Sequence, residues 1–453
     1  MSAHDARLFA VTVMVLLVLR FALLLLLWAV GGEPLQPDSS LYLQLAVGLV
    51  EHGWFSSSLD LYRPEVFRTP GYPAYLGFFQ WLGLGDRFWP LLVQELLYLA
   101  TVGVYYIGTR SLLDSGLARA VVVFLLVEPG GIGYPKLILS DTLNLVMIVP
   151  AVFAVGWHLK TGRWNWLLLA GLLLGAVVWV RPANFLLPVV FAPVLLVASG
   201  FGRTGCIRAA LLVLVAALTL SPWLARNQIV FGTPYLSGQA SNMFLNYHLP
   251  YVWEVARGLR FQEGQREAAV LAEQAFFAAE SKRDGPLNTV ERFRLQQQAA
   301  LDALLQYPVV YAQTWVIGML KTLLGPGMLD AYAAFGYQSE RVRFAALDEV
   351  SFAHKVRSFL EYLDWVVLAE VALRAGLLLL ALVGAVVIMR AGSPFLWIIM
   401  LLSAYTIVVP GPMGLARLRF AAEGFLFLQA WIGLRCLLQR SARWRTLASV
   451  PNK

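Results

Sequence analysis

The chain has 453 residues, of which 59% are hydrophobic and 14% are charged, with a mean hydropathy of +0.67 and a formal net charge of +8. This composition excludes a soluble globular protein, whose surface needs more charged side chains. It also does not indicate nucleic-acid binding, because the basic residues lie between apolar segments and form no run with interleaved aromatic residues.

Ten apolar stretches are long enough to cross a bilayer as helices, which takes roughly 20 residues each. They lie near residues 8–30, 88–109, 117–133, 138–157, 164–180, 183–200, 208–225, 364–389, 394–410 and 415–438. The first is longer than the apolar region of a signal peptide, so we expect a retained anchor. The shorter stretches 70–84 and 308–325 are open to three interpretations: a surface helix, an extension of a neighbouring helix, or a crossing. The sequence predicts an all-α polytopic membrane protein with about 10–12 transmembrane helices.

The basic residues of the short connections indicate the orientation, since cytoplasmic loops are enriched in lysine and arginine. One side of the membrane receives Arg7, Arg110, Arg119, Lys160, Arg163, Arg203, Arg208, Arg390 and the C-terminal tail, provided that neither short stretch crosses. Both ends of the chain are then cytoplasmic. The outer side receives most acids of the short loops: Glu33, Asp38, Glu51, Asp60, Glu65, Asp86 and Asp141. Because acids contribute little to insertion, this clustering indicates function.

We divide the chain into three parts. Residues 1–225 contain seven predicted spans and the first outer loop, 31–69. Residues 226–363 form an outer region with mixed-charge helical patterns, and residues 364–453 contain the last spans and a short cytoplasmic tail. No internal repeat is found, whereas many transporters have two paired halves.

Asp38 directly precedes a predicted helix, 38–51, in the first outer loop. Two interpretations are open: the side chain caps the helix, or it acts as a general base toward the hydroxyl of an acceptor at the outer leaflet. Asp141, with Lys136 nearby, stands at a second outer turn and has the same two interpretations, a helix start or a functional acid. Charged residues at membrane depth are costly, which favours function for such a cluster.

Arginines at the outer ends of spans contradict the positive-inside rule and need an anion. They are Arg181, Arg226, Arg417 and Arg419. The anion is either a lipid headgroup or the phosphate of a lipid-linked substrate, which arginine binds through two parallel hydrogen bonds. Inside the spans, we assign no role to Arg20. Glu370 and Arg374 are four residues apart on one helix, and we predict that they neutralise each other.

No metal or other cofactor is required by these patterns. A divalent metal is compatible with them, but His52 and His248 have no recognised ligand spacing. The two cysteines, Cys206 and Cys436, lie far apart and predict neither a disulfide framework nor a thiolate metal site.

Six segments, taken together and in order, resemble polyprenyl-phosphate-sugar-dependent glycosyltransferases of the GT-C fold. They read PDSSLYLQLAVGLVEHG, FRTPGYPAYLGFFQWLG, LILSDTLN, VWVRPANFLLP, SPWLARNQIVFGTPYLSG and ARLRFAAEGFLFLQAW. The most similar group is the bacterial branch related to dolichyl-phosphate-mannose protein mannosyltransferases and aminoarabinose transferases. The resemblance covers the chain up to about residue 240 and, more weakly, residues 405–430.

The resemblance implies a GT-C-like bundle with a shared module of seven spans. It also implies a catalytic base in the first outer loop, which falls on Asp38, and a second acid in the next outer loop, which falls on Asp141. The family often has a second acid directly after the first, whereas Ser39 and Ser40 follow here. This departure puts a metal role for such a pair in doubt.

Near the last span, Arg417 and Arg419 match an Arg-Tyr-Arg-like stretch of the family, although Leu418 replaces its aromatic residue and Ala421 its usual proline. The candidate ligands of the donor phosphate are Lys136, Arg181, Arg226, Arg417 and Arg419. The candidate substrate contacts are Arg68, Tyr72 and His248.

The function that follows is an integral-membrane inverting glycosyltransferase. We expect it to move a sugar from a polyprenyl-phosphate donor to an acceptor hydroxyl on a lipid, glycan or protein, at the periplasmic or exterior face of a bacterial cytoplasmic membrane, among membrane lipids and without nucleic acid. The alternatives are a lipid-linked glycan transporter, a polymerase or ligase with a diphosphate-linked donor, and a non-catalytic scaffold subunit.

Overall fold

The computed structural model describes residues 3–32, 34–282, 285–327 and 365–438. Within these residues every regular element is a helix, and the single β-type pairing is an isolated bridge between Ser56 and Pro64. The predicted all-α fold is therefore confirmed. The predicted outer region 226–363 is described up to residue 327, and the predicted cytoplasmic tail from residue 439 lies outside the described residues.

Six segments are long and apolar enough to cross a membrane. They are α1 (Ala3–Ala29), α4 (Phe88–Leu112), α7 (Asp141–Thr161), α10 (Arg203–Phe231), α18 (Trp365–Ala391), and the continuous pair η6 (Ala416–Ala422) and α20 (Glu423–Leu438). Three shorter apolar helical segments accompany them: α8 (Trp164–Val180), η2 (Pro182–Asn184) with α9 (Leu187–Ala198), and α19 (Pro394–Val408). The chain is a multi-pass membrane protein.

A tenth segment is bent by 61°. It consists of α5 (Ser115–Val127), followed by α6 (Pro129–Gly133) and η1 (Tyr134–Lys136). The bend falls at Glu128, because the residue before a proline disfavours helical backbone and Pro129 has no N–H to continue the ladder. Glu128 instead accepts a hydrogen bond from the backbone N–H of Gly131 at 2.6 Å and starts the new helix. Each of the ten apolar stretches predicted from the sequence thus contains helix.

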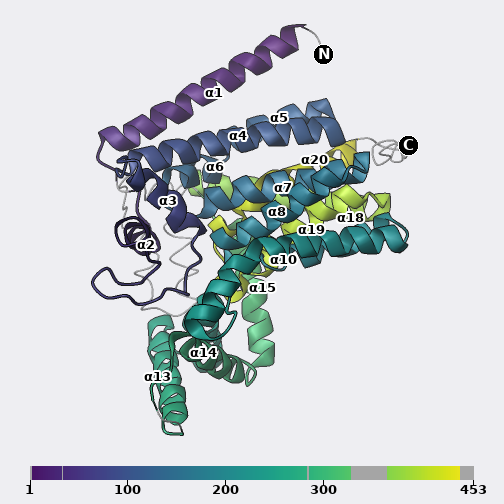
Figure 1. Cartoon of the computed structure of the whole chain (residues 1–453). Helices are drawn as coiled ribbons and strands as arrows, with labels where there is room; N and C mark the ends of the chain where they lie inside the picture. Colours follow the sequence, from purple (N-terminus) through teal and green to yellow (C-terminus); the bar gives the residue numbers. More distant parts are fainter. Residues whose placement is uncertain (1–2, 33, 283–284, 328–364, 439–453) are drawn as a thin grey trace.

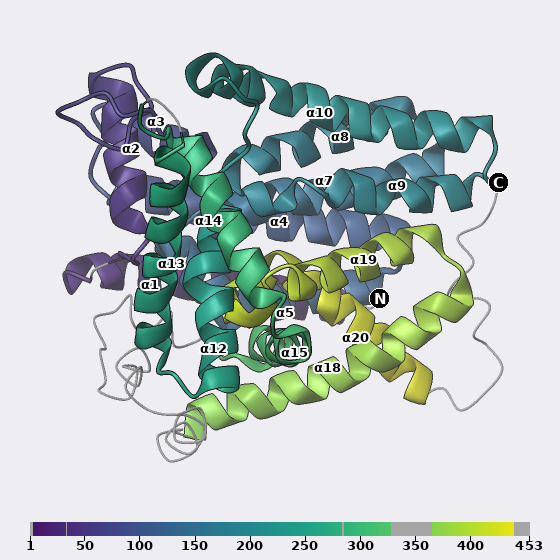
Figure 2. The same ribbon diagram turned by 90° about the horizontal axis from the view of Figure 1, so that it is seen from below.

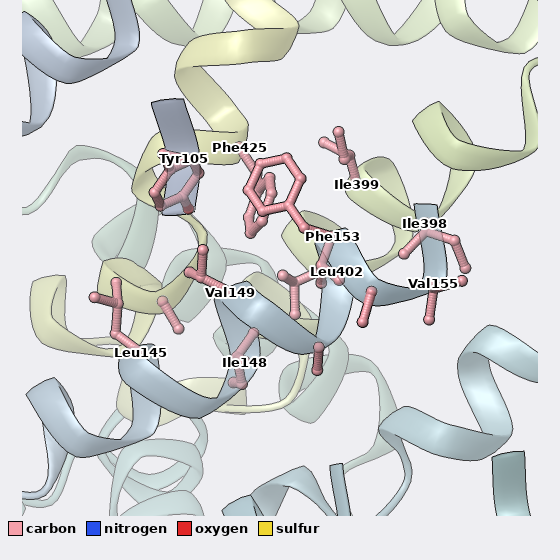
Figure 3. Packing of buried hydrophobic residues seen from close by; sticks show 14 of the residues in the cluster. Tyr105, Leu145, Ile148, Val149, Phe153, Val155, Ile398, Ile399, Leu402 and Phe425 are labelled. Atoms are coloured by element: carbon pink, nitrogen blue, oxygen red, sulfur yellow. The ribbon is translucent and has the colours of Figure 1, made fainter. Parts of the chain in front are cut away.

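The core of the bundle is built around α7, which lies between α4, α8 and the C-terminal helices (Figure 1). Figure 3 shows Phe153 of α7 grouped with Tyr105 of α4 and Phe425 of α20. The ring centroids of Phe153 lie 5.6 and 5.7 Å from those of Tyr105 and Phe425. Small residues bring α18 and α20 together, because a Cβ added at Gly384 would lie 1.9 Å from the Gln429 carbonyl oxygen.

A layer of helices, which we call the outer layer, covers one end of the bundle, opposite the end at which α1 begins and α20 ends (Figure 1). It contains α2 (Ser39–Glu51) and α3 (Gly71–Trp81), which pack on each other. Further along the chain it contains α11 (Gln239–Met243), the π-helix η3 (Phe244–His248), α12 (Leu249–Arg257), α13 (Phe261–Glu280), α14 (Thr289–Leu304) and α15 (Pro308–Leu324). A second small core, with Leu249, Val252, Ala268, Ala300 and Leu304, holds α12 to α14 together.

The two short apolar stretches form α3 and α15. With 11 residues, α3 is about 16 Å long, about half of what a crossing needs. Helix α15 runs across the direction of the bundle helices, as the two views in Figures 1 and 2 agree. We therefore interpret both as helices of the outer layer.

The connection between α19 and α20 carries η5 (Gly411–Met413) and η6, and α15 packs directly on it. Gly414 has a φ of +38°, and a Cβ there would lie 2.2 Å from the carbonyl oxygen of Gly318. Only glycine fits this backbone and this contact. The turn brings η6, and with it Arg417, to the first outer loop.

Candidate active site

Asp38 lies at the start of α2, as the sequence predicts, but its side chain accepts no capping hydrogen bond from the helix. Instead, its carboxylate lies between two arginines. Oδ1 is 2.7 Å from Nη2 of Arg68, and Oδ2 is 3.1 Å from Nη2 of Arg417. The structure therefore decides against the capping interpretation and gives Asp38 partners that are 30 and 379 residues away.

The Asp38 side chain is 26% exposed, so solvent reaches it. Burial alone would raise the pKa of the Asp38 carboxyl, but the Arg68 and Arg417 guanidinium groups outweigh burial and hold this pKa below the ordinary aspartate value. Asp38 is consequently a carboxylate at neutral pH and can accept a proton or a hydrogen bond.

Aromatic side chains hold Arg68 in place. Its Nη1 donates to the Tyr42 hydroxyl at 3.3 Å, and its guanidinium lies 5.0 Å from the ring centres of both Tyr42 and Phe67. Tyr72 packs edge-on against Tyr42 at 4.9 Å and donates its hydroxyl hydrogen to Gln94 at 2.8 Å. Helices α2, α3 and α4 therefore meet beside the Asp38 carboxylate.

Asp141, the first residue of α7, continues the site. One of its carboxylate oxygens lies 2.9 Å from Nη2 of Arg181, and its side chain is 1% exposed. Arg181 also donates from Nε to the Ser140 hydroxyl at 3.2 Å, and this hydroxyl lies 3.4 Å from that of Tyr42. Neither oxygen of Asp141 takes part in a well-formed hydrogen bond within the described residues.

A continuous chain of contacts thus runs from Arg417 through Asp38, Arg68, Tyr42 and Ser140 to Arg181 and Asp141. We call this set the Asp38 cluster. Of the predicted site residues, the structure brings together Asp38, Asp141, Arg68, Tyr72, Arg181 and Arg417. Three arginines and two aspartates leave the cluster with one net positive charge, which suits an anionic group.

Lys136 lies apart from this cluster, in a buried ion-pair network. Its ammonium group is 2.9 Å from Oε2 of Glu95 and donates to the carbonyl of Ile132, while Oε1 of Glu95 is 2.6 Å from Nε of Arg20. All three side chains are almost fully buried. Arg181 and Arg417 are partly exposed, whereas the Lys136 side chain is 1% exposed and paired with a buried carboxylate, so we do not retain Lys136 among the phosphate ligands. Arg20, which the sequence left without an assignment, has its partner here.

Arg419 lies in a second buried network, although it is only two residues from Arg417. It pairs with Glu423 and donates to the carbonyls of Thr322 and Gly325 at the end of α15. Glu423 also pairs with Arg374 at 2.9 Å, and Arg374 lies 2.7 Å from Glu128 and 3.0 Å from Glu370. The predicted Glu370–Arg374 pair is therefore present, inside a larger set. Arg419 is fully engaged with the protein, and we do not retain it as a phosphate ligand.

Arg226 braces the first outer loop from α10. Its guanidinium donates to the carbonyls of Glu65 at 2.8 Å and Phe55 at 3.3 Å, and it stacks on the Trp223 ring at 5.1 Å. These contacts hold the segment that ends in Arg68, so Arg226 contributes to the shape of the loop.

His248 joins η3 to the neighbouring helices. Its Nδ1 lies 3.0 Å from the Tyr311 hydroxyl of α15, and a Cβ at Gly411 of η5 would lie 2.9 Å from its Nε2. Burial lowers the pKa of His248 to about 4, so the ring is neutral at physiological pH. We interpret His248 as a packing residue of the outer layer.

Several partners in these networks were not found from the sequence, among them Tyr42, Ser140, Glu95 and Glu423. Tyr42 and Ser140 carry no signal for this contact, because hydroxyl side chains are common and only the fold brings α2 to the residue before α7. Glu95 does carry one, since a single acid inside an apolar span indicates a buried cation nearby. Among the described residues, no group of three or more histidine, cysteine or acidic side chains is arranged to hold a metal ion.

None of the known protein families and none of the curated protein sequences matches the chain. Among solved structures, the chain is similar to the archaeal oligosaccharyltransferase AglB from Archaeoglobus fulgidus in complex with an inhibitory peptide and a dolichol-phosphate. The identity is 12% and the TM-score 0.48, over 93% of this chain and 48% of AglB, so the chain spans about half the length of that protein.

The chain is also similar to ArnT from Cupriavidus metallidurans, bound to undecaprenyl phosphate and in the apo state. The identity is 13% in both cases, with TM-scores of 0.41 and 0.40, over 92% of this chain and 77% of ArnT. At such identities and scores the similarities carry no argument about function, so the donor and the acceptor have to be argued from the residues of this chain.

Proposed function

We propose that this protein is an inverting glycosyltransferase that moves a sugar from a polyprenyl-phosphate donor to an acceptor hydroxyl. The observation that carries the proposal is the partly exposed carboxylate of Asp38, held between Arg68 and Arg417 at one end of an apolar bundle. A carboxylate beside cations, at the level where a lipid headgroup lies, can serve proton transfer and phosphate binding in the same place.

The donor phosphate is the anion that the positive charge of the cluster fits. Arg181 and Arg417 are each 19% exposed, and their guanidinium groups are the phosphate ligands that we propose. The choice of a polyprenyl carrier rests on the sequence resemblance; the similar structures contain dolichol-phosphate and undecaprenyl phosphate. The lipid tail would lie along the apolar helices.

The reaction is a single displacement. The acceptor oxygen forms a bond to the anomeric carbon while the bond from this carbon to the phosphate oxygen breaks, and the configuration inverts. The hydroxyl proton goes to Asp38, and the bonding electron pair leaves with the polyprenyl phosphate, whose charge the arginines stabilise. A phosphate leaving group held by cations needs no strong general acid. Asp141, buried beside Arg181, would orient Arg181 and the sugar hydroxyls.

We place the reaction at the periplasmic or exterior face of a bacterial cytoplasmic membrane. The support is the position of α2, which directly follows Asp38 and lies at the end of the bundle opposite the end at which α1 begins and α20 ends (Figure 1). The predicted cytoplasmic position of the basic connections supports the same orientation.

The test uses purified protein in lipid nanodiscs with a panel of radiolabelled polyprenyl-phosphate sugars, and follows the transfer or release of sugar. Wild type is expected to turn over one donor, and Asp38→Asn to lose this turnover. Asp60→Asn is the matched control, because Asp60 is an exposed acid of the same outer loop outside the cluster. No turnover of any donor, with lipid binding retained, would favour a transporter or an enzyme for diphosphate-linked glycans.

A further inference from the structure

The two arginines that hold Asp38 come from different parts of the fold. Arg68 belongs to the same outer loop as Asp38, and its guanidinium is also fixed by Tyr42 and Phe67. Arg417 comes from η6, between the last two membrane helices. Its Nη2 lies 3.1 Å from Asp38, whereas Nη2 of Arg68 lies 2.7 Å from Asp38. Each arginine takes a different oxygen of the carboxylate.

This arrangement presents a chemical conflict. A carboxylate paired with two cations is a weak base, because the cations stabilise its ionised form and so lower its affinity for the proton of the acceptor. The same Arg417 is one of the two ligands proposed for the donor phosphate. Asp38 and one of the proposed phosphate ligands therefore neutralise each other in this structure.

We propose that Arg417 exchanges between Asp38 and the donor phosphate, while Arg68 stays on Oδ1 as a positioning residue and Oδ2 becomes the atom that accepts the proton. This inference rests on the proposed function and adds a regulation to it. The incoming phosphate competes for the guanidinium, which binds phosphate with two parallel hydrogen bonds. When Arg417 leaves, Asp38 loses a cation and gains an anion nearby, and both changes make it a stronger base. The base is thus activated only when the donor is in place.

The exchange makes a prediction about binding that does not depend on catalysis. If Arg417 has to leave Asp38 to bind phosphate, then neutralising Asp38 releases Arg417 beforehand. Asp38→Asn is therefore expected to bind undecaprenyl phosphate about 3- to 10-fold more tightly than wild type. This range corresponds to the upper end of what a partly exposed ion pair contributes.

A double-mutant cycle tests whether this gain passes through Arg417. Binding of undecaprenyl phosphate is measured in nanodiscs of zwitterionic lipid for wild type, Asp38→Asn, Arg417→Gln, Arg68→Gln and the two doubles with Asp38→Asn. The gain is expected to be much smaller in the Arg417→Gln background, where only direct repulsion between Asp38 and phosphate remains, and to persist at full size in the Arg68→Gln background. Arg68 is the matched control, because it pairs with the same carboxylate. Thermal unfolding of each variant identifies any that fail to fold.

Two outcomes of this cycle would overturn the exchange. Asp38→Asn with unchanged affinity would show that no competition exists, and a gain of undiminished size without Arg417 would show that repulsion between Asp38 and phosphate accounts for all of it. Replacing undecaprenyl phosphate with phosphatidylglycerol is expected to give no gain; an equal gain would make Arg417 a ligand of bulk headgroups and reject the assignment to the donor.

A second measurement covers the case in which Arg417→Gln binds too weakly to measure. The charged groups that act on Asp38 are Arg68 and Arg417. In wild type, the acid limb of kcat, which reports the donor complex, is expected at higher pH than that of kcat/KM, which reports the free enzyme. Coincident limbs would overturn the exchange. If no sugar is transferred but the double-mutant cycle gives the expected binding changes, the proposed function fails and the exchange of Arg417 between Asp38 and phosphate stands.

Discussion

Two regions of this protein contain arginines paired with carboxylates, and they differ in whether the paired side chains remain accessible to solvent. In the Asp38 cluster, Asp38 and Arg417 are 26% and 19% exposed, and one cation of the cluster is in excess. In the buried networks around Glu95 and Arg374, the side chains are buried and held by several partners at once. The buried networks can only hold helices together, whereas the Asp38 cluster can bind and react.

The two buried networks meet at the bend between α5 and α6. Arg20 donates to the carbonyl of Gly131, Glu128 accepts from the Gly131 N–H, and Arg374 pairs with Glu128. They contain four cations, Arg20, Lys136, Arg374 and Arg419, and four carboxylates, Glu95, Glu128, Glu370 and Glu423. The charges balance, which is the condition under which charges persist inside a membrane bundle. These networks fix the bent segment and η6, the two elements that deliver Ser140 and Arg417 to the site.

The largest expected effect on activity is that of Asp38→Asn. Loss of the general base should lower kcat by roughly 100- to 10,000-fold. Donor binding should be retained or strengthened, because the substitution removes a negative charge next to the phosphate ligands. Steady-state kinetics with the identified donor measures both. Asp60→Asn should leave kcat unchanged, and near-normal turnover of Asp38→Asn would reject the assignment of the base.

Removing the centre of the larger buried network is expected to cost stability rather than chemistry. Arg374→Gln leaves Glu128, Glu370 and Glu423 together without their shared cation, and breaking a buried pair from one side costs about 3–5 kcal/mol. Thermal unfolding in detergent should show a strongly lowered midpoint and poor yield. Full stability of Arg374→Gln would mean that the network is not what holds the bent segment.

The two neighbouring arginines Arg417 and Arg419 illustrate how much of the fold and of the candidate site could be predicted from the sequence. The sequence shows which stretches are helical and apolar, and it singles out Asp38 as an acid at a helix start, because these depend on local patterns. It does not distinguish Arg417 from Arg419, since both stand at the outer end of a span. What separates them is the 3₁₀-helix η6, which directs Arg419 toward α15 and Arg417 toward the first outer loop. Such directions depend on packing between segments hundreds of residues apart.

The pair Arg417 and Arg419 sharpens the comparison further. Arg417→Gln is expected to raise the KM for the donor about 10- to 100-fold with little change in stability, since a charge-assisted contact to phosphate is worth about 1.5–3 kcal/mol. Arg419→Gln is expected to lower the unfolding midpoint instead, because Glu423 and two backbone carbonyls lose a partner. Donor kinetics and thermal unfolding on both variants provide the contrast. Equal effects on KM would mean that the two side chains share one role.

The smallest expected effect belongs to an exposed pair, Asp114 with Arg435, which joins the connection before α5 to the end of α20. Both side chains are 31% exposed, so Arg435→Gln should cost only about 0.2–1 kcal/mol at neutral pH.

Burial would raise the pKa of Asp114, but backbone N–H groups and Arg435 outweigh burial and lower it. The stabilisation by this pair is therefore present above the ordinary aspartate pKa and is lost as the pH falls through the depressed one. Unfolding of wild type and Arg435→Gln should differ slightly at pH 7 and converge at strongly acidic pH. A difference as large as that of Arg374→Gln would contradict the division between exposed and buried pairs, because exposure is what makes a pair dispensable for the fold and accessible to a substrate.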